Sequence, residues 1–506
     1  MVNIERIHET FSLYFPINRR IKALMVKYTV PSTTVVSRRC ERELLLASYH
    51  ATRSQFIAVY GRRRIGKTLL VRETFGYHFT FQHAGLARGS MSQQLFAFEG
   101  SLREAGLESS HHPANWLQAF ELLKDLIRQS GDERKLIFID ELSWMDTPRS
   151  DLMVALESFW NGWASARKDV VLIVCASATS WMLDKVVHNK GGLYNRLTTQ
   201  IYLKPFTLKE CEELLYAKGI VMDRMQTLEC YMVMGGVPYY WDLLQRGRSL
   251  AQNIDDIFFG QSAPLAHEYD YLFSSLFKNP EGHLAIIKAL ATRKAGMTRD
   301  DLIRSSRIAS SGTLTKLLSE LESCGFIRRY QAFGKTKRDA IYQLIDNFTL
   351  FHHKFLESGN GDDEYYWSSQ VMSPALNAWR GVAFERVCLE HVSQIKRALG
   401  ISGVHTEVSS WTCKADAEQG IHASQIDLLV KRADNVINLC EMKYSKREYA
   451  LTRRDEEALR HKACDFQALS KSRCAIHVTL VTTYGLVHNA HAGTVQSVVC
   501  AEDLFA

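Results

Sequence analysis

The sequence lacks the features that would assign it to a membrane, secreted or zinc-binding class. None of its apolar runs approaches the ~20 residues needed to span a bilayer, and the first residues, MVNIERIHETF, contain no signal-peptide core. The eleven cysteines form no CxxC pair and no Cys/His run with zinc spacing. We therefore expect reduced thiols, a cytoplasmic location and no membrane partner.

Internal repeats and low-complexity tracts are also missing from the chain. The 506 residues are 46% hydrophobic and 23% charged, which is ordinary for a soluble globular protein. At roughly 100–200 residues per domain, this length predicts about three domains. Each domain is expected to bury a core of its own.

From Phe56 onward, short apolar runs rich in branched and aromatic side chains alternate with amphipathic stretches. Five of these runs are predicted to be buried strands: 56–60, 78–83, 136–140, 170–175 and 201–203. Such alternation predicts an α/β layer with a parallel sheet. A helical stretch is expected to follow, from Leu208 to about Leu272.

A phosphate-binding motif lies between the first predicted strand and the helix expected at 67–75. Its glycines let backbone N–H groups wrap around phosphates, and the N-terminus of the following helix favours an anion. Lys67 is expected to reach the β- and γ-phosphates, and the Thr68 hydroxyl to ligate Mg²⁺. The motif fits GxxxxGK[ST] in full and predicts an ATP site with Mg²⁺ built from Gly61, Arg62, Arg63, Arg64, Ile65, Gly66, Lys67 and Thr68.

Acidic and polar residues follow the later strands of the predicted sheet. In LIFIDEL, Asp140 is expected beside the phosphate loop, where it can hold Mg²⁺ through water, and Glu141 can polarise an attacking water. This acid pair predicts hydrolysis as well as binding. Ser177 or Thr179 is a candidate sensor of the γ-phosphate, or simply caps a helix. Arg196 is a candidate arginine finger, with a structural ion pair as the alternative.

Six fragments, in this order, carry a family resemblance: GRRRIGKT, LIFIDELSWM, CASATSWM, LYNRLT, LKPF and MGGVPYYW. They resemble the archaeal-type ATPases of the AAA+/STAND group, over about residues 36–355. The resemblance implies a further strand between the phosphate-loop strand and the Asp140 strand. It also implies a helical lid that includes Gly236, Val237 and Pro238, and a winged helix that can serve as a packing module.

Residues 283–346 follow a different pattern, with three short helical stretches and then a hairpin whose turn is basic. This order resembles a winged helix-turn-helix. Between Lys288 and Arg338, twelve lysines and arginines stand against four acids. Such clustering is expected of a phosphate-backbone contact, so we expect a nucleic acid partner, with DNA as the first candidate. A solvated basic face and a packing module are the alternatives.

A carboxylate–lysine pattern lies near the C-terminus. Asp427 and the motif Glu441-Met442-Lys443 occupy successive predicted strands joined by a short turn. Alternation puts Glu441 and Lys443 on one face, and antiparallel pairing is expected to bring Asp427 close to them. Two carboxylates can bind Mg²⁺ and a lysine can activate water for attack on a phosphodiester, while Glu385 can add a ligand from a helix. We expect one cluster on a half-open face.

The fragments FERVCLEH, SQIDLLV and LCEMKYS resemble the PD-(D/E)xK nuclease-like domain over about 370–500, with Ile426-Asp427 in place of its leading Pro-Asp. The fold class expected is α/β, with a P-loop NTPase sheet, a helical lid, a winged helix and a restriction-endonuclease-like α/β domain. The predicted divisions are an N-terminal extension (1–35), a P-loop ATPase core (36–205), a lid (206–280), a winged-helix-like domain (281–357), a linker (358–364) and a nuclease-like domain (370–506).

These predictions combine into one leading hypothesis. The protein is an ATP-hydrolysing switch that controls a C-terminal nuclease-like domain acting on nucleic acid, expected to be DNA. The alternative is an ATP-dependent regulatory or scaffold protein whose nuclease fold is inactive and binds DNA or a protein partner. Oligomerisation is compatible with both hypotheses. Cleavage that requires Mg²⁺ or Mn²⁺ and Glu441 would distinguish them.

Overall fold

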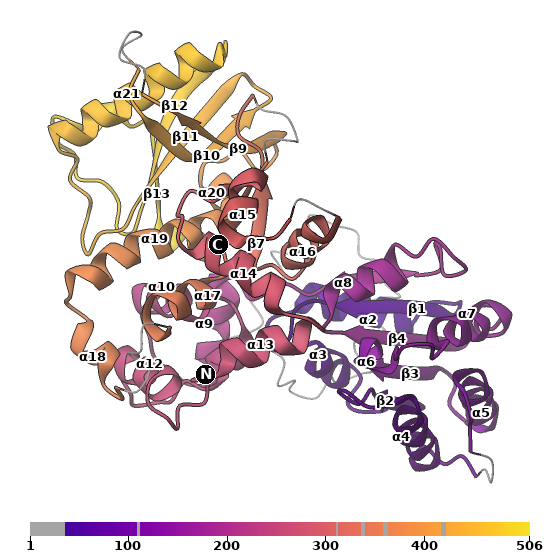
Figure 1. Cartoon of the computed structure of the whole chain (residues 1–506). Helices are drawn as coiled ribbons and strands as arrows, with labels where there is room; N and C mark the ends of the chain where they lie inside the picture. Colours follow the sequence, from indigo (N-terminus) through magenta and orange to yellow (C-terminus); the bar gives the residue numbers. More distant parts are fainter. Residues whose placement is uncertain (1–35, 109–111, 310–311, 335–339, 358–362, 416–420) are drawn as a thin grey trace, which may run out of the picture.

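The computed structural model describes residues 36–108, 112–309, 312–334, 340–357, 363–415 and 421–506. The predicted N-terminal extension lies outside these residues, as does most of the predicted linker. Three sheets organise the described chain, and they lie in different parts of the molecule (Figure 1). In these ranges, no helix is both long and apolar enough to cross a membrane.

The N-terminal sheet is parallel and has the strand order β2-β3-β4-β1-β5. Its strands are β1 (Gln55–Tyr60), β2 (Phe81–Ala84), β3 (Lys135–Asp140), β4 (Val170–Ala176) and β5 (Thr199–Tyr202). All five predicted strands are thus confirmed, although β2 begins at Phe81 and not at residue 78. Strand β4 separates β1 from β3, as the family resemblance implied.

Helices cover both faces of the N-terminal sheet (Figure 1). One face packs against α2 (Arg39–Tyr49) and α3 (Lys67–Thr74), and the other against α4 (Met91–Glu104), α5 (Trp116–Gln129) and α7 (Leu152–Gly162). Along β1, Phe56 and Ala58 enter one of these cores while Ile57 and Val59 enter the other. A strand buried on both faces is apolar throughout, which explains the unbroken hydrophobic run in the sequence.

The chain then forms a helical region and a small sheet. The helices are α9 (Leu208–Ala217), α10 (Arg224–Met234), α11 (Pro238–Asp242), α12 (Leu250–Phe258) and α13 (Glu268–Leu276). The small sheet has the order β6-β8-β7 and packs with three helices: β6 (Met297–Thr298), β7 (Ile327–Tyr330), β8 (Ile341–Leu344), α14 (Glu281–Ala291), α15 (Arg299–Ser306) and α16 (Gly312–Ser323). The predicted order of three helices and a hairpin is confirmed.

The C-terminal sheet is mixed, with the order β13-β12-β11-β10-β9. Its strands are β9 (Thr406–Cys413), β10 (Ser424–Arg432), β11 (Val436–Lys443), β12 (Ala475–Thr482) and β13 (Ser497–Cys500). Between β8 and β9 the described residues form five helices, α17 (Asn347–Phe351), η5 (His352–Leu356), α18 (Tyr366–Gln370), α19 (Pro374–Glu390) and α20 (Val392–Ala398). Of these, α17 packs against α10 and α18 against α12, whereas α19 packs against β11. The long helix α21 (Arg453–Ser470) follows β11 and packs against β10 and β12. The helix from which Glu385 was expected to add a ligand is α19, which ends before His391.

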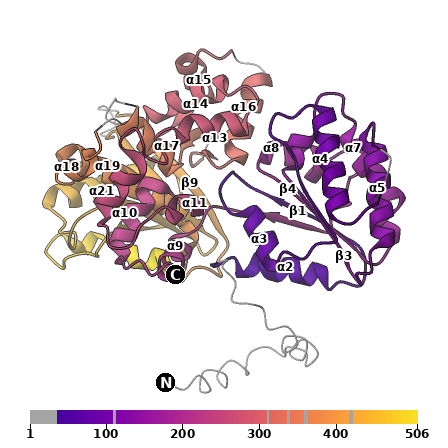
Figure 2. The same ribbon diagram turned by 90° about the horizontal axis from the view of Figure 1, so that it is seen from below.

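One large hydrophobic core joins most of the chain that follows the N-terminal sheet. It takes buried side chains from Phe206 to Phe505 and so includes the helical region, the small sheet and part of the C-terminal sheet. His391 contributes a buried polar contact to it, because its Nε2 accepts a hydrogen bond from the Leu208 N–H at 3.2 Å. Burial lowers the pKa of His391 to about 4, so this acceptor stays neutral. Seen from below, this C-terminal half lies beside the N-terminal sheet (Figure 2).

Candidate functional site

The phosphate loop connects β1 to α3, and its backbone path requires glycine at two positions. A Cβ on Gly61 would lie 2.3 Å from the carbonyl oxygen of Leu203, closer than any real Cβ contact. Gly66 precedes α3 with φ of +86°, a left-handed conformation that L side chains rarely adopt. The loop therefore turns tightly into the N-terminus of α3, where free backbone N–H groups favour an anion. Ile65 secures the loop by packing into the core below.

Lys67 is buried and lies inside the phosphate loop. Its Nζ donates to the carbonyl oxygens of Gly61 and Arg62 and to Ser177 Oγ, each at 3.0 Å. Burial is the largest influence on the pKa of Lys67 and lowers it, whereas the charges of Glu141 and Asp140 raise it. The ammonium group is thus held by loop oxygens in the place where a bound phosphate would need a cation.

Thr68 and Asp140 meet as the sequence predicted. Thr68 Oγ1 donates to Asp140 Oδ2 at 2.6 Å, and the backbone N–H of Glu141 donates to Asp140 Oδ1 at 3.0 Å. Asp140 is the last residue of β3 and is buried. A hydroxyl and a carboxylate side by side are oxygen donors of the kind that Mg²⁺ prefers, so these two residues fit the cation.

Glu141 adopts a left-handed backbone conformation, with φ of +47°, before the short helix α6 (Leu142–Met145). Such strain in a residue other than glycine is typical of functional sites. Its carboxylate accepts hydrogen bonds from the Ser177 N–H, at 2.9 Å, and from the Ser177 hydroxyl. Ser177, which is one of the two candidate sensors, therefore contacts both Lys67 and Glu141.

Thr179 and Arg196 lie apart from this network. Thr179 is fully buried at the start of α8 (Thr179–Met182), a helix that packs against α16. Arg196 is exposed in the segment before β5, and no contact found in the described ranges joins it to the phosphate loop. Arg63 is half-buried, and its charge lowers the pKa of Lys67. The roles predicted for Thr179 and Arg196 stay predictions.

Arg62 reaches from the phosphate loop into the C-terminal half. It forms an ion pair with Asp346, the residue before α17, and both side chains are buried. Its guanidinium carbon lies 4.8 Å from the centre of the Phe326 ring. Burial lowers the pKa of Arg62, but the charge and hydrogen bond of Asp346, together with Tyr240, outweigh burial, so the pKa of Arg62 is raised. No sequence pattern indicated this contact, because it joins residues 284 positions apart.

Arg64 makes a second contact of the same kind. It pairs with Glu268 of α13 at 2.5 Å, and its guanidinium carbon lies 4.4 Å from the centre of the Tyr239 ring on α11. Glu268 is buried, and it also accepts a hydrogen bond from the Tyr240 hydroxyl at 2.8 Å. Tyr239 and Tyr240 belong to the MGGVPYYW fragment, which was the only sequence signal near this contact.

Comparison with known proteins agrees with this nucleotide site. Residues 36–244 match the model of a family described as an ATPase domain predominantly from Archaea. These residues are therefore similar to an archaeal-type ATPase domain. Among curated proteins, an uncharacterized protein of Methanocaldococcus jannaschii is 23% identical over 387 residues, which cover 74% of this chain and 81% of that protein.

Three solved structures of archaeal proteins show a weak similarity to this chain. The Walker-type ATPase of Pyrococcus abyssi has a TM-score of 0.41 at 13% identity, covering 62% of this chain and 95% of that one. The Aeropyrum pernix ORC2 protein with ADPNP and ADP has a TM-score of 0.38 at 14% identity, covering 72% and 97%. A STAND protein with a tetratricopeptide repeat sensor from Pyrococcus horikoshii has a TM-score of 0.28 at 15% identity, covering 73% and 48%.

Outside the ATPase domain, the structure brings Glu441 and Lys443 together. Lys443 Nζ lies 3.0 Å from one carboxylate oxygen of Glu441, and Lys462 Nζ of α21 lies 2.7 Å from the other. Burial raises the pKa of Glu441, but the two lysines outweigh burial and leave the pKa below its ordinary value. Both carboxylate oxygens of Glu441 are thus engaged by cations of this chain.

Glu385 has cationic partners of its own. It is buried on α19, where it pairs with Arg386 at 2.9 Å and with Lys294 from the loop after α14. Burial and the charge of Asp427 raise the pKa of Glu385, against the opposite effect of the two cations. Asp427 accepts a hydrogen bond from Gln425. The charge of Asp427 thus acts on Glu385.

A β-bulge breaks the alternation from which we expected Asp427 to face Glu441. Ile426 and Leu429 pack in the same cluster with α21, so two residues lie between them where regular alternation allows one. Leu428, in contrast, packs into the core shared with α19. In the described part of the chain, no group of three or more His, Cys, Asp or Glu side chains could hold a metal ion. The predicted cluster of Asp427, Glu385 and Glu441 around one cation is not assembled.

The basic segment 288–338 is partly neutralised by contacts within the chain. Several of its cations have partners: Lys288–Glu357, Lys294–Glu385, Arg304–Asp301 and Arg328–Gln343. Burial lowers the pKa of Arg328 to about 10, and its guanidinium carbon lies 4.4 Å from the centre of the Tyr330 ring. Arg328 is thus a packing residue of β7, which favours the packing-module alternative for that position.

Proposed function

We propose that this protein is an ATP-dependent molecular switch, in which ATP binding and hydrolysis in the ATPase domain control the C-terminal half. The observation that carries the proposal is that two arginines of the phosphate loop contact residues beyond the N-terminal sheet. Arg62 pairs with Asp346, and Arg64 pairs with Glu268. Asp346 precedes α17 and Glu268 begins α13, and both helices belong to the single core that extends to Phe505.

Charge makes these contacts sensitive to the nucleotide. A phosphate in the loop brings negative charge next to guanidinium groups that already hold carboxylates. Arg62 can then exchange Asp346 for a phosphate oxygen, which releases α17 from the loop. A ligand shifts an equilibrium only by its differential affinity for the two states, and the exchange of a buried ion-pair partner supplies such a difference.

For hydrolysis, we propose roles that follow the contacts of each residue. Lys67 neutralises the β- and γ-phosphates, and Thr68 and Asp140 hold Mg²⁺, which when bound screens the phosphate charge. Glu141 accepts the proton of the attacking water. Arg196 and Thr179 keep their proposed roles as arginine finger and γ-phosphate sensor.

The switch is tested by amide hydrogen exchange with and without ATP and Mg²⁺. We expect ATP to accelerate exchange in α17, because the ion pair of Asp346 that anchors this helix is released. The same measurement on α5, which lies in the ATPase domain away from that ion pair, serves as the internal control. Unchanged exchange in α17 at saturating ATP would refute the proposal that ATP controls the C-terminal half.

Asp346→Asn is expected to destabilise the nucleotide-free protein by about 3–5 kcal/mol, because Arg62 is left buried without its counter-charge. ATP should restore more stability to this variant than to the natural protein, since a phosphate then supplies the only anion for Arg62. Urea denaturation with and without ATP measures both effects. Asp300→Asn, at an exposed position of α15, is the matched control and should change stability by less than about 0.5 kcal/mol. Equal stabilisation by ATP in both proteins would count against the exchange.

We propose that the C-terminal domain regulates or binds, and does not cut. The support is that Glu441 is held by Lys443 and Lys462, and Glu385 by Lys294 and Arg386, so neither carboxylate is free for a cation. The nuclease-like fold of residues 370–506 remains part of this proposal, with cleavage as its competitor. Cleavage of DNA in Mn²⁺ that Glu441→Ala abolishes would establish the nuclease in its place.

Nucleic acid is the partner that we propose for the C-terminal half, with DNA as the first test. Arg307 at the end of α15 and Arg329 on β7 are exposed, in contrast to the packed Arg328. Their exposed charges are the observation that favours this partner.

Replacing both Arg307 and Arg329 by glutamate is expected to weaken DNA binding by a similar factor for every DNA sequence. It should also reduce the slope of log K against log salt by about two, one for each phosphate that the variant no longer neutralises. Fluorescence anisotropy across a salt series measures both quantities. Lys168→Glu, an exposed position of the ATPase domain, is the control. An unchanged slope in the double variant would contradict the proposed DNA contact and favour the packing-module alternative.

A further inference from the structure

A cavity of about 380 Å³ lies where the small-sheet region meets the C-terminal domain. Its walls come from α14 and the loop after it, from α17 and η5, and from α19. Helices α14, α17 and α19 lie next to one another in Figure 1, away from the N-terminal sheet. The volume is in the range of small-molecule sites, and neither the nucleotide site nor the carboxylate pairs account for it.

The walls of this cavity carry an excess of positive charge. Arg293, Lys294, Lys354 and Arg386 all contribute, and no aspartate or glutamate is found among the described residues that line it. Lys294 and Arg386 share the single carboxylate of Glu385, which lies outside the lining. The side chains that line the cavity therefore bring cationic groups and no carboxylate to its surface.

Arg386 is the cationic side chain of this site that the fold holds most firmly. It is 1% exposed, and its two terminal nitrogens are fixed by Glu385 and by the carbonyl oxygen of Lys294. Its Nε has no hydrogen-bond partner among the described residues. A buried hydrogen-bond donor without a partner destabilises the folded state. A ligand in the adjoining cavity can supply the missing acceptor. Arg293, by contrast, is exposed at the rim and carries no ion pair that the described chain shows.

The rest of the lining is apolar. Leu290 of α14, Leu344 of β8 and Leu350 of α17 form one part, and Trp379 with Ala383 of α19 forms another. The Trp379 side chain is nearly buried and therefore fixed in position. A cavity with an apolar, partly aromatic wall and a cationic rim favours a ligand that has both an apolar body and an anionic group.

We propose that this cavity binds a small organic anion, with a phosphate or carboxylate group held by Arg293 and Lys294 and an aromatic or aliphatic body against Trp379. The ligand contacts α14 and α19 at once, so its binding strengthens the junction between the small-sheet region and the C-terminal domain. This effector site is inferred without the proposed nucleotide switch, although Leu350 of its wall lies on α17, the helix that the switch is proposed to release.

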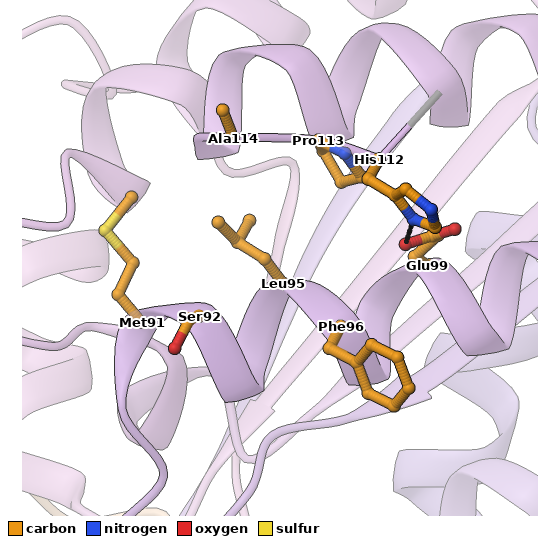
Figure 3. A pocket seen from close by; sticks show the side chains of 8 residues that line it. All are labelled: Met91, Ser92, Leu95, Phe96, Glu99, His112, Pro113 and Ala114. Atoms are coloured by element: carbon orange, nitrogen blue, oxygen red, sulfur yellow. Dashed lines mark hydrogen bonds and ion pairs between the residues drawn. The ribbon is translucent and has the colours of Figure 1, made fainter. Parts of the chain in front are cut away.

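A second cavity, of about 460 Å³, offers a comparison within the same molecule (Figure 3). It lies along α4 and is lined by apolar side chains such as Leu95 and Phe96, with the Glu99–His112 pair at one end. No lysine or arginine is among its described lining residues. An anionic probe should therefore prefer the first cavity over this one, although both are partly apolar.

The test uses 1-anilinonaphthalene-8-sulfonate, a fluorescent aromatic anion, with the full-length protein. We expect saturable binding that Ala378→Trp weakens about tenfold or more, because Ala378 is an exposed lining residue and a larger side chain there covers the cavity without entering the core. Arg293→Glu should weaken binding by a similar factor through charge. Lys278→Glu, exposed and outside the cavity, and Ser92→Trp, in the comparison cavity, should leave binding unchanged.

Competition then defines the chemical class. Phenyl phosphate should displace the probe at lower concentrations than inorganic phosphate, which lacks the apolar body, or benzyl alcohol, which lacks the charge. Displacement by benzyl alcohol as effective as that by phenyl phosphate would overturn the anion proposal. Absence of probe binding, or binding that Ala378→Trp and Arg293→Glu leave unchanged, would overturn the site itself. Far-UV circular dichroism of each variant confirms that it is folded.

Discussion

Lys67→Ala is expected to reduce ATP turnover by at least about 10²–10³-fold, the effect of removing one positioned charge donor from a transition state. In the nucleotide-free protein the Lys67 ammonium group is held by the carbonyl oxygens of Gly61 and Arg62 and by Ser177. These acceptors lose their donor in the variant. The larger consequence arises with ATP, because the variant has no ammonium group for the β- and γ-phosphates.

Nucleotide affinity should fall together with turnover, since a phosphate clamp acts on the bound state and the transition state alike. Titration with a fluorescent ATP analogue measures binding, and phosphate release measures turnover. Lys185→Ala removes an exposed lysine of the same domain and is the matched control. Turnover that survives in Lys67→Ala would contradict the assignment of residues 61–68 as the phosphate loop.

Glu141→Gln is the second change with a large expected effect, and it should separate hydrolysis from binding. The amide keeps the size of the carboxylate but cannot take a proton from water. General-base catalysis contributes about 10²–10⁴-fold, so we expect a loss of turnover in that range. ATP affinity should change little, because the side chain oxygen can still accept a hydrogen bond from the Ser177 N–H.

Single-turnover phosphate release and the same binding titration give the two quantities for Glu141→Gln. Glu121→Gln, on the exposed side of α5, is the control. If affinity falls as far as turnover does, Glu141 is a binding residue and the base lies elsewhere. The strained backbone of Glu141 should be retained by glutamine, so a loss of folding is not expected from this variant.

The local geometry of the phosphate loop could be predicted because its determinants are close together in the sequence. Residues 61–68 form one loop, and its glycines, lysine and threonine follow one another along the chain. Asp140 comes from another strand, yet its position was predictable because the carboxyl ends of parallel strands share one edge of a sheet. The hydrogen bond from Thr68 to Asp140 follows from these two facts.

The C-terminal carboxylates show which contacts cannot be predicted from the alternation of residues along a strand. Alternation within β11 places Glu441 and Lys443 on one face, and they do meet. The relation of Asp427 to them depends on a register shift between β9 and β10, which no pattern of residue types announced. The DNA-contact prediction for the basic segment met the same limit at Arg328, because the partner of a cation depends on which side chains the fold brings to it, here the amide of Gln343.

The sequence by itself determined the parallel sheet, the phosphate loop and the acid pair beside it, since each depends on residue type at short spacing and on the buried, two-faced environment of the strands. Only the tertiary structure decided which residues the loop arginines meet. Arg62 finds Asp346 and Arg64 finds Glu268 because α13 and the residue before α17 are carried to the loop by one continuous core. The packing of many side chains together determines such long-range contacts. No single sequence motif therefore predicts them.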